Sequence, residues 1–167
     1  LDKTGTITHG NRQAEEFYPA TGITPQAMAE AAQLSSLADH TPEGKSILNL
    51  ARTRYDLADG VAPAGCEFIE FSAETRTSGV KIGDRLILKG AADAIEKHLK
   101  QFNATIPDDV KQNVDKVARQ GGTPLVVADG ARVVGMIHLK DIVKAGIKER
   151  LADLRRMGIK SVMITGD

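Results

Sequence analysis

The first residues of the chain combine the side chains that a phosphoryl transfer needs. Asp2 supplies a carboxylate that can attack a terminal phosphate and form an aspartyl phosphate. Lys3 adds positive charge, Thr4 adds a hydroxyl that can bind phosphoryl oxygens, and Gly5 lets the backbone approach a phosphate closely. Asp, Thr and Gly are also common in turns, so an ordinary N-terminal turn stays open as the alternative.

A second candidate segment lies at the other end of the sequence. Thr165 closes the apolar run 159–165, which predicts a strand, and open α/β sheets bind ligands at that end of their strands. A helix predicted over 143–157 precedes this strand, and the two together are typical of half a parallel βαβ unit. The alternative for Thr165 is an ordinary turn that ends a strand.

The middle of the chain predicts a different architecture. Thr24-Pro25 and Thr41-Pro42 each combine a helix N-cap with a proline in the first helical turn. The sequence predicts helices that start at 25 and 42 and others over 90–101 and 107–120, with strands at 13–18, 68–71, 77–82, 85–89, 124–128 and 132–139. We therefore expect an α+β fold in which an antiparallel sheet is flanked by helices.

The contrast between the middle and the ends predicts the domain organisation. Residues 12–138 are expected to form the α+β domain. Residues 1–11 and 139–167 are expected to be segments of an incomplete α/β domain into which that domain is inserted.

Composition excludes several classes of function. Of the 167 residues, 22 are Lys or Arg and 22 are Asp or Glu, so no net charge attracts nucleic acid or an anionic membrane. No apolar run approaches the roughly 18 residues that a membrane span needs. The single cysteine, Cys66, leaves no disulfide partner within the chain and is typical of a reducing compartment. The four His residues show no metal-ligand spacing, so a zinc site is not expected.

Two aromatic residues and one lysine stand out in the middle of the chain. Phe68 and Phe71 are three residues apart in a predicted strand, so they would face opposite sides. We expect Phe68 in the core and Phe71 in a pocket, with both in the core as the alternative. Gly90 follows Lys89, so we expect the ammonium of Lys89 to be open to a ligand; a solvent-exposed lysine at a strand end is the alternative.

These segments together resemble the P-type ATPases. Residues 2–6 resemble their phosphorylation loop, and 165–167 resemble the Thr-Gly-Asp segment of the same domain. Residues 40–46, 71–79 and 88–91 resemble, in that order, the catalytic subunits of the Kdp potassium-transporting branch. The sequence has no His-Pro pair, which the heavy-metal pumps carry, and it lacks the Lys-Gly-Ala-Pro-Glu of the calcium and sodium pumps.

The resemblance implies that the inserted domain binds ATP. Phe71 would stack on the adenine, and Lys89 would line the same pocket. Asp39 and Glu43 would accept hydrogen bonds near the base or the ribose. The other residues implied for this site are Ser72, Arg76, Thr77, Ser78 and Gly90.

The resemblance also implies what the ends of the chain do. Asp2 would receive the γ-phosphate of ATP, with Mg²⁺ bridging the phosphate and the carboxylate of Asp2, while Thr165 would help to hold the phosphoryl group. Residues 8–12 and 138–141 would form a two-strand hinge. The chain would be a cytoplasmic part of a bacterial or archaeal membrane protein that transports potassium and assembles with other subunits.

Two other functions stay open. A haloacid-dehalogenase-type phosphatase uses the same aspartyl chemistry, but it usually carries a second Asp where this chain has Thr4, which cannot act as a base at neutral pH. A non-catalytic nucleotide-binding module is the third hypothesis, because the Gly-Asp-Gly-x-x-Asn-Asp and Thr-Gly-Glu-Ser segments of the pumps do not occur here. We expect this chain by itself to bind ATP weakly and to hydrolyse it negligibly.

Overall fold

The computed structural model describes residues 8–58, 60–143 and 146–159, and for 8–11 and 142–143 it describes only the backbone. These ranges cover the predicted inserted domain and the helix that follows it. Four candidate site residues and nearly all of the last predicted strand lie outside the described residues; the four are Asp2, Lys3, Thr4 and Thr165.

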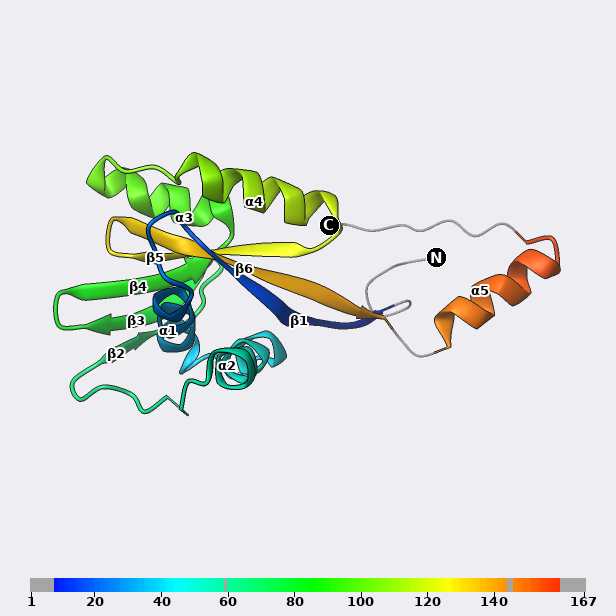
Figure 1. The fold of residues 1–167 in the computed structure, drawn as a ribbon, viewed down its shortest axis with the longest axis horizontal. Coiled ribbons are helices and arrows are strands. Elements are labelled where there is room, and N and C mark those ends of the chain that lie inside the picture. Colours follow the sequence, from blue (N-terminus) through cyan, green and yellow to red (C-terminus); the bar gives the residue numbers. More distant parts are fainter. Residues whose placement is uncertain (1–7, 59, 144–145, 160–167) are drawn as a thin grey trace.

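The strands of the described part form one six-stranded antiparallel sheet in the order β1-β6-β5-β4-β3-β2 (Figure 1). Their bounds are β1 (Thr8–Pro19), β2 (Glu67–Ile69), β3 (Thr77–Ile82), β4 (Arg85–Gly90), β5 (Thr123–Asp129) and β6 (Arg132–Val143). Gly83 and Gly130 occupy the tight turns of two hairpins with φ of +59 and +62, which glycine adopts without strain. The predicted antiparallel sheet is confirmed.

The helices begin where the sequence places their caps. Thr24 and Thr41 accept hydrogen bonds on their side chains from Ala27 N and Gly44 N, each over 3.1 Å, and a proline follows each of the two threonines. The helices are α1 (Pro25–Ser36), α2 (Pro42–Tyr55), α3 (Ala92–Leu99), α4 (Asp108–Arg119) and α5 (Ile147–Arg156), with a short 3-10 helix η2 (Lys100–Phe102) after α3.

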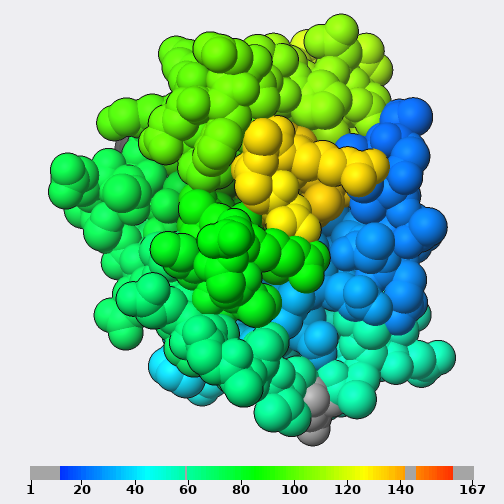
Figure 2. All heavy atoms as spheres, turned by 90° about the vertical axis from the view of Figure 1, so that its left-hand side faces the viewer, coloured from blue at the N-terminus to red at the C-terminus, as the bar shows by residue number. Residues whose placement is uncertain are grey.

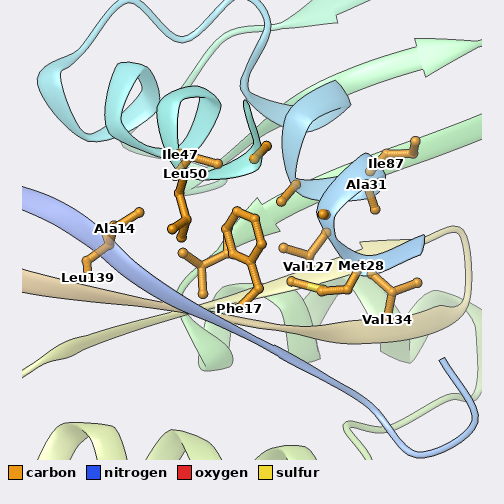
Figure 3. Close-up of a cluster of buried hydrophobic side chains, with 14 of the residues drawn as sticks. Ala14, Phe17, Met28, Ala31, Ile47, Leu50, Ile87, Val127, Val134 and Leu139 are labelled. Atoms are coloured by element: carbon orange, nitrogen blue, oxygen red, sulfur yellow. The ribbon is translucent and has the colours of Figure 1, made fainter. Parts of the chain in front are cut away.

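Each face of the sheet is covered by a pair of helices, so the domain has three layers (Figure 1). Side chains alternate across the sheet: Ile87 packs with α1 and α2, whereas its neighbour Leu88 packs with α3 and α4. Phe17 lies at the centre of the core on the α1 and α2 side (Figure 3), and its ring stacks on Tyr55 with centroids 5.2 Å apart. The central strands are therefore buried on both faces, whereas the edge strand β2 is partly exposed.

The first and last strands extend further than predicted. β1 begins at Thr8 rather than at 13, and it pairs with β6 out to Val143, opposite Thr8. The helix expected from 143 therefore begins only at Ile147. The two segments expected to form a hinge, 8–12 and 138–141, belong to this pair of strands, and in its register they meet at Arg12 and Asp141.

Contacts between the β3–β4 and β5–β6 turns tie together one end of the sheet. Figure 2 shows this end, with the β5–β6 turn (yellow-orange) between the helical layer of α3 and α4 (green, above) and the β3–β4 turn. Arg85 Nε donates to Asp129 Oδ2 over 2.9 Å, and Gly130 N donates to the carbonyl of Leu86 over 2.7 Å. These contacts fix the register of the central strands, which carry part of the candidate site.

Candidate functional site

A pocket of about 320 Å³ opens beside the end of α1. Its walls come from the end of α1, the turn between α1 and α2, the connection from β2 to β3, and β3 itself. The lining residues are Ser35, Ala38, Asp39, His40, Thr41, Ile69, Glu70, Phe71, Ser78 and Gly79. Three residues predicted for the nucleotide site, Asp39, Phe71 and Ser78, thus lie around one pocket although they are far apart in the sequence.

Phe71 is the aromatic residue of this pocket. Its side chain is 67% exposed, which is unusual for a ring of this size. It lies after β2, which ends at Ile69, so the alternation of a strand does not decide its direction. The expectation that Phe68 belongs to the core is wrong: it is 42% exposed, because β2 is the edge strand and no layer covers it there.

Lys89 lies behind the pocket wall. Only 4% of its side chain is exposed, so the expectation of an ammonium open to a ligand does not hold in the structure. Its Nζ donates to Asp39 Oδ2 over 2.6 Å and to Ser36 Oγ over 2.9 Å. Lys89 pairs with Ser78 in the β3–β4 register, so both side chains lie on the face of the sheet that α1 covers.

The Asp39–Lys89 pair shapes the electrostatics of the pocket. Burial lowers the pKa of Lys89 below its ordinary value, although the hydrogen bond and charge of Asp39 and the charge of Glu43 oppose this. Burial alone would raise the pKa of Asp39, but the hydrogen bonds from Lys89 and Thr41 and the charge of Lys89 outweigh it and lower the pKa. Asp39 is therefore a carboxylate at neutral pH, 18% exposed on the pocket side.

The start of α2 holds Asp39 in place. The backbone N and the Oγ1 of Thr41 donate to Asp39 Oδ1 over 3.1 and 2.5 Å. Gly44 leaves the space that Asp39 occupies, since a Cβ at this position would lie 2.4 Å from Asp39 Cγ. Glu43, in the same helical turn, accepts from Arg12 N over 3.4 Å and does not line the pocket.

The remaining predicted residues lie along the strand ends near the pocket without lining it. Ser72 bonds to Thr75 between their hydroxyls, 2.7 Å apart, and Arg76 NH2 donates to Asp93 over 2.6 Å. Thr77 is buried and pairs with Gly90 in the β3–β4 register.

A larger pocket, of about 550 Å³, lies between α2 and the paired strands β1 and β6. It is lined by Gln13, Ala14, Glu15, Ser46, Asn49, Leu50, Thr53, Arg54, Lys140 and Asp141. It contains no aromatic ring and none of the predicted site residues, so the smaller pocket suits a nucleobase better.

Sequence reasoning missed several residues around the candidate site. Thr41 was expected only as a helix cap, yet its second role is to bind Asp39. Ser36 and Gly44 were not expected as site residues. Nothing in a serine at a helix end indicates a bond to Lys89, 53 residues away, and nothing in a glycine of a first turn indicates that it makes room for the Asp39 side chain.

Two searches of the described residues gave negative results. No group of three His, Cys, Asp or Glu side chains there could hold a metal ion. No helix of the described ranges has the length and apolar character to cross a membrane.

Comparison with known sequences gives a match over the whole chain. The family model described as haloacid dehalogenase-like hydrolase matches residues 1–167. The "Potassium-transporting ATPase ATP-binding subunit" of Yersinia enterocolitica is 61% identical over 168 residues, which are 100% of this chain and 24% of the relative. The subunit of the same name from Yersinia pestis is 60% identical with the same coverage. The chain thus spans about a quarter of the length of these curated relatives.

Solved structures share the fold. A zinc-transporting PIB-type ATPase in the E2.Pi state aligns with a TM-score of 0.71 at 23% identity, over 99% of this chain and 25% of that one. The N-domain of HMA6, a copper-transporting P-type ATPase, aligns with a TM-score of 0.55 at 15% identity, over 77% of this chain and 98% of that one. The resemblance to the P-type ATPases and the predicted fold class are confirmed, and the match of all 167 residues to the family model means that the chain belongs to the haloacid dehalogenase-like hydrolases.

Proposed function

We propose that this chain is the ATP-binding and phosphoacceptor part of an ATP-driven potassium-transporting P-type ATPase. The observation that carries the proposal is the exposed ring of Phe71 at a pocket that also contains the Asp39 carboxylate. The 61% identity to a subunit named for ATP binding and potassium transport supports the same assignment.

The pocket has the chemistry that an adenine needs. Its volume of about 320 Å³ is at the lower end of ordinary ligand pockets, which suits a base with the sugar and phosphates outside. Stacking on Phe71 would contribute roughly 1–3 kcal/mol, as base stacking on aromatic side chains does elsewhere. Asp39 offers an acceptor for the exocyclic amino group, and Ser78 offers a hydroxyl from the opposite wall.

The remaining predicted residues have supporting roles in this proposal. Lys89 contributes positive charge behind Asp39, and Glu43 contributes negative charge at the start of α2. Ser72, Arg76, Thr77 and Gly90 lie at the strand ends where the ribose and phosphates would leave the pocket. Only the NH2 of Arg76 is bound to Asp93, so the other N–H groups of its guanidinium are the donors that a phosphate would use.

The phosphoryl transfer is assigned to the ends of the chain. A carboxylate oxygen of Asp2 attacks the γ-phosphorus of ATP, the bond from that phosphorus to the bridging oxygen breaks, and ADP leaves. Lys3, Thr4 and Thr165 bind the phosphoryl oxygens during this step. The carboxylate of Asp2 is the type of oxygen donor that Mg²⁺ prefers, and bound Mg²⁺ supplies the charge that brings two anionic groups together.

The paired strands β1 and β6 are the connection through which the two functions would be coupled. We assign the hinge to 8–12 and 138–141, so that closure carries the nucleotide toward Asp2. In the complete protein this part would face the cytoplasm of a bacterium or archaeon, beside other subunits of a membrane transport complex.

Two alternatives have specific support. The match to a hydrolase family favours a phosphatase, and the pocket with its exposed aromatic ring would equally serve a non-catalytic nucleotide-binding module. A phosphatase would turn over simple phosphate esters quickly in the complete protein, whereas a pump would accumulate a phosphorylated Asp2 that decays slowly.

Titration of the isotope-labelled 167-residue chain with nucleotides tests the proposal. ATP and adenosine should both shift the amide signals of Phe71, Ser78 and Asp39, because the base occupies the pocket, while tripolyphosphate should leave these three signals in place. Signals of Glu15 and Asn49, in the larger pocket, are the internal control. Shifts confined to those two residues, or none at all with ATP, would contradict the proposed site.

A further inference from the structure

Lys89 is a buried cation with two oxygen acceptors. Its ammonium carries three N–H donors and is sealed from solvent, so every acceptor around it matters for keeping it charged. One acceptor is the Asp39 carboxylate, and the other is the Oγ of Ser36, which is itself fully buried. Ser36 does not line the nucleotide pocket, and its hydroxyl reaches the pocket wall through Lys89. The carbonyl of Ser36 also accepts from Asp39 N over 3.0 Å, a backbone bond that a change of side chain keeps.

The two serines that end α1 face different partners. Ser35 Oγ donates to the carbonyl of Ala32 over 3.0 Å, within its own helix, whereas Ser36 Oγ accepts from Lys89. Both serines are buried, both are next to each other at the same helix end, and both have the same size. Ser35 lines the pocket and Ser36 does not, so Ser35 is a matched control for the state of Lys89 but not for nucleotide affinity.

Gly44 lies against Asp39, the other member of the pair. Its backbone is not in the left-handed region, so the need for glycine here is a need for space. A Cβ would lie 2.4 Å from both the Cγ and the carbonyl oxygen of Asp39, distances that real Cβ atoms do not show. Any side chain at Gly44 would therefore push Asp39 away from Lys89 and from the pocket wall.

We infer that Ser36 and Gly44 are positioning residues, which hold the Asp39–Lys89 pair in the geometry that the nucleotide pocket uses. The Oγ of Ser36 accepts from the ammonium of Lys89 and holds it in place. Gly44 leaves the space that Asp39 needs to contact Lys89 and to line the pocket. Neither residue contacts the nucleotide. This inference rests on the proposed ATP site for its effect on binding, but the state of the pair can be measured without any ligand.

Ser36→Ala in the 167-residue chain is the first test. The side-chain NMR signals of Lys89, followed against pH, report its pKa directly, and removal of one acceptor should lower that pKa further. The affinity for ATP at neutral pH should fall by about threefold to tenfold, the range that the loss of one ordinary hydrogen bond covers. The alkaline pH at which affinity is lost should shift downward together with the pKa of Lys89. Ser35→Ala should leave the pKa of Lys89 unchanged; because Ser35 lines the pocket, this variant is a control for that pKa and not for the affinity.

Gly44→Ala is the second, independent variant. Alanine is the better helix former, so helix propensity alone predicts no loss for this change. If Gly44 is there to make room for Asp39, the variant should instead lower the pKa of Lys89 and weaken ATP binding, while Lys45→Ala, at an exposed position one residue on, should do neither.

The outcomes separate the two claims. Failure of the wild-type chain to bind ATP would overturn the proposed function alone, because the Lys89 signals would still show whether Ser36 and Gly44 hold the pair. Unchanged Lys89 signals in both Ser36→Ala and Gly44→Ala would overturn the positioning role. Equal effects of Ser35→Ala and Ser36→Ala on the Lys89 signals would overturn it as well, since they would indicate general damage to the end of α1.

Discussion

Lys89 and Asp39 lie 50 residues apart in the sequence, and Lys89 Nζ donates a hydrogen bond to Asp39 Oδ2 over 2.6 Å. The bond joins β4 in the middle of the sheet to the turn between α1 and α2. The two partners differ in burial, since 4% of the Lys89 side chain and 18% of the Asp39 side chain are exposed. The pair therefore connects the interior of the domain to the wall of the pocket.

Because Lys89 is more buried than Asp39, removal of Asp39 should lower the free energy of unfolding more than removal of Lys89 does. Asp39→Ala leaves a buried ammonium without its main partner and should cost about 3 kcal/mol of unfolding free energy. Lys89→Met keeps the apolar stem and leaves Asp39 with its bonds from Thr41 and some water, so about 1 kcal/mol is expected. Urea unfolding of both variants measures the difference, and a Lys89→Met variant that is the less stable of the two would contradict this account.

The same pair predicts how stability depends on acid. The pKa of Asp39 is lowered below 3.8 in the folded chain, because Lys89 and Thr41 outweigh the effect of burial. Between the folded and unfolded pKa values the unfolded state binds more protons, so this stabilisation is complete above about pH 4 and is lost as the pH falls further. The Asp39→Asn variant lacks it at every pH.

The measurement is the gap in unfolding free energy between wild type and Asp39→Asn. Other carboxyl groups with a lowered pKa, such as Asp93 and Asp109, are present in both proteins and cancel. The gap should narrow as the pH falls below about 4. A gap that stays constant down to pH 2 would show that Asp39 does not titrate as described.

Substitution of Phe71 should weaken nucleotide binding strongly and change the stability of the fold little, because the ring is exposed at the pocket. Phe71→Ala should raise the Kd for ATP by about tenfold or more, because the base loses its stacking partner. Phe68→Ala is the matched control, since that ring is also exposed and only three residues away but does not line the pocket. Isothermal titration with ATP compares them, and equal losses in the two variants would remove Phe71 from the site.

Local signals in the sequence predicted most of the fold. Thr24 and Thr41, each followed by proline, located the starts of α1 and α2 to the residue, because a cap acts within one turn. The strands predicted over 77–82 and 85–89, and over 124–128 and 132–139, left only two or three residues between them, and Gly83 and Gly130 occupy these turns. The antiparallel sheet and its flanking helices follow from these local elements.

What the sequence could not predict depends on partners far along the chain. β1 starts at Thr8 because β6 continues to Val143 beside it, and neither polar segment indicates this alone. Phe68 is exposed because β2 is the last strand of the sheet, a position set by the order of all the others. For the candidate site, three residues expected from the motifs, Asp39, Phe71 and Ser78, line one pocket. The burial of Lys89 could not be predicted, because it depends on where α1 packs on β4.

Removal of the Asp109 carboxylate should lower the free energy of unfolding, because this carboxylate helps to hold α4 on the sheet. Its Oδ2 accepts from the backbone N and the Oγ1 of Thr21, over 2.8 and 2.9 Å, and so ties the loop after β1 to the first turn of α4. Asp109→Ala should cost about 0.5–1 kcal/mol, because it removes the acceptor of both bonds in an exposed contact where solvent screens the charge. Asp108→Ala removes the same charge from the same turn without touching the bonds to Thr21, so both variants lose the helix-dipole contribution equally. Thermal unfolding of the two variants isolates the tie to Thr21, and equal melting temperatures would mean that these two hydrogen bonds contribute nothing to holding α4 on the sheet.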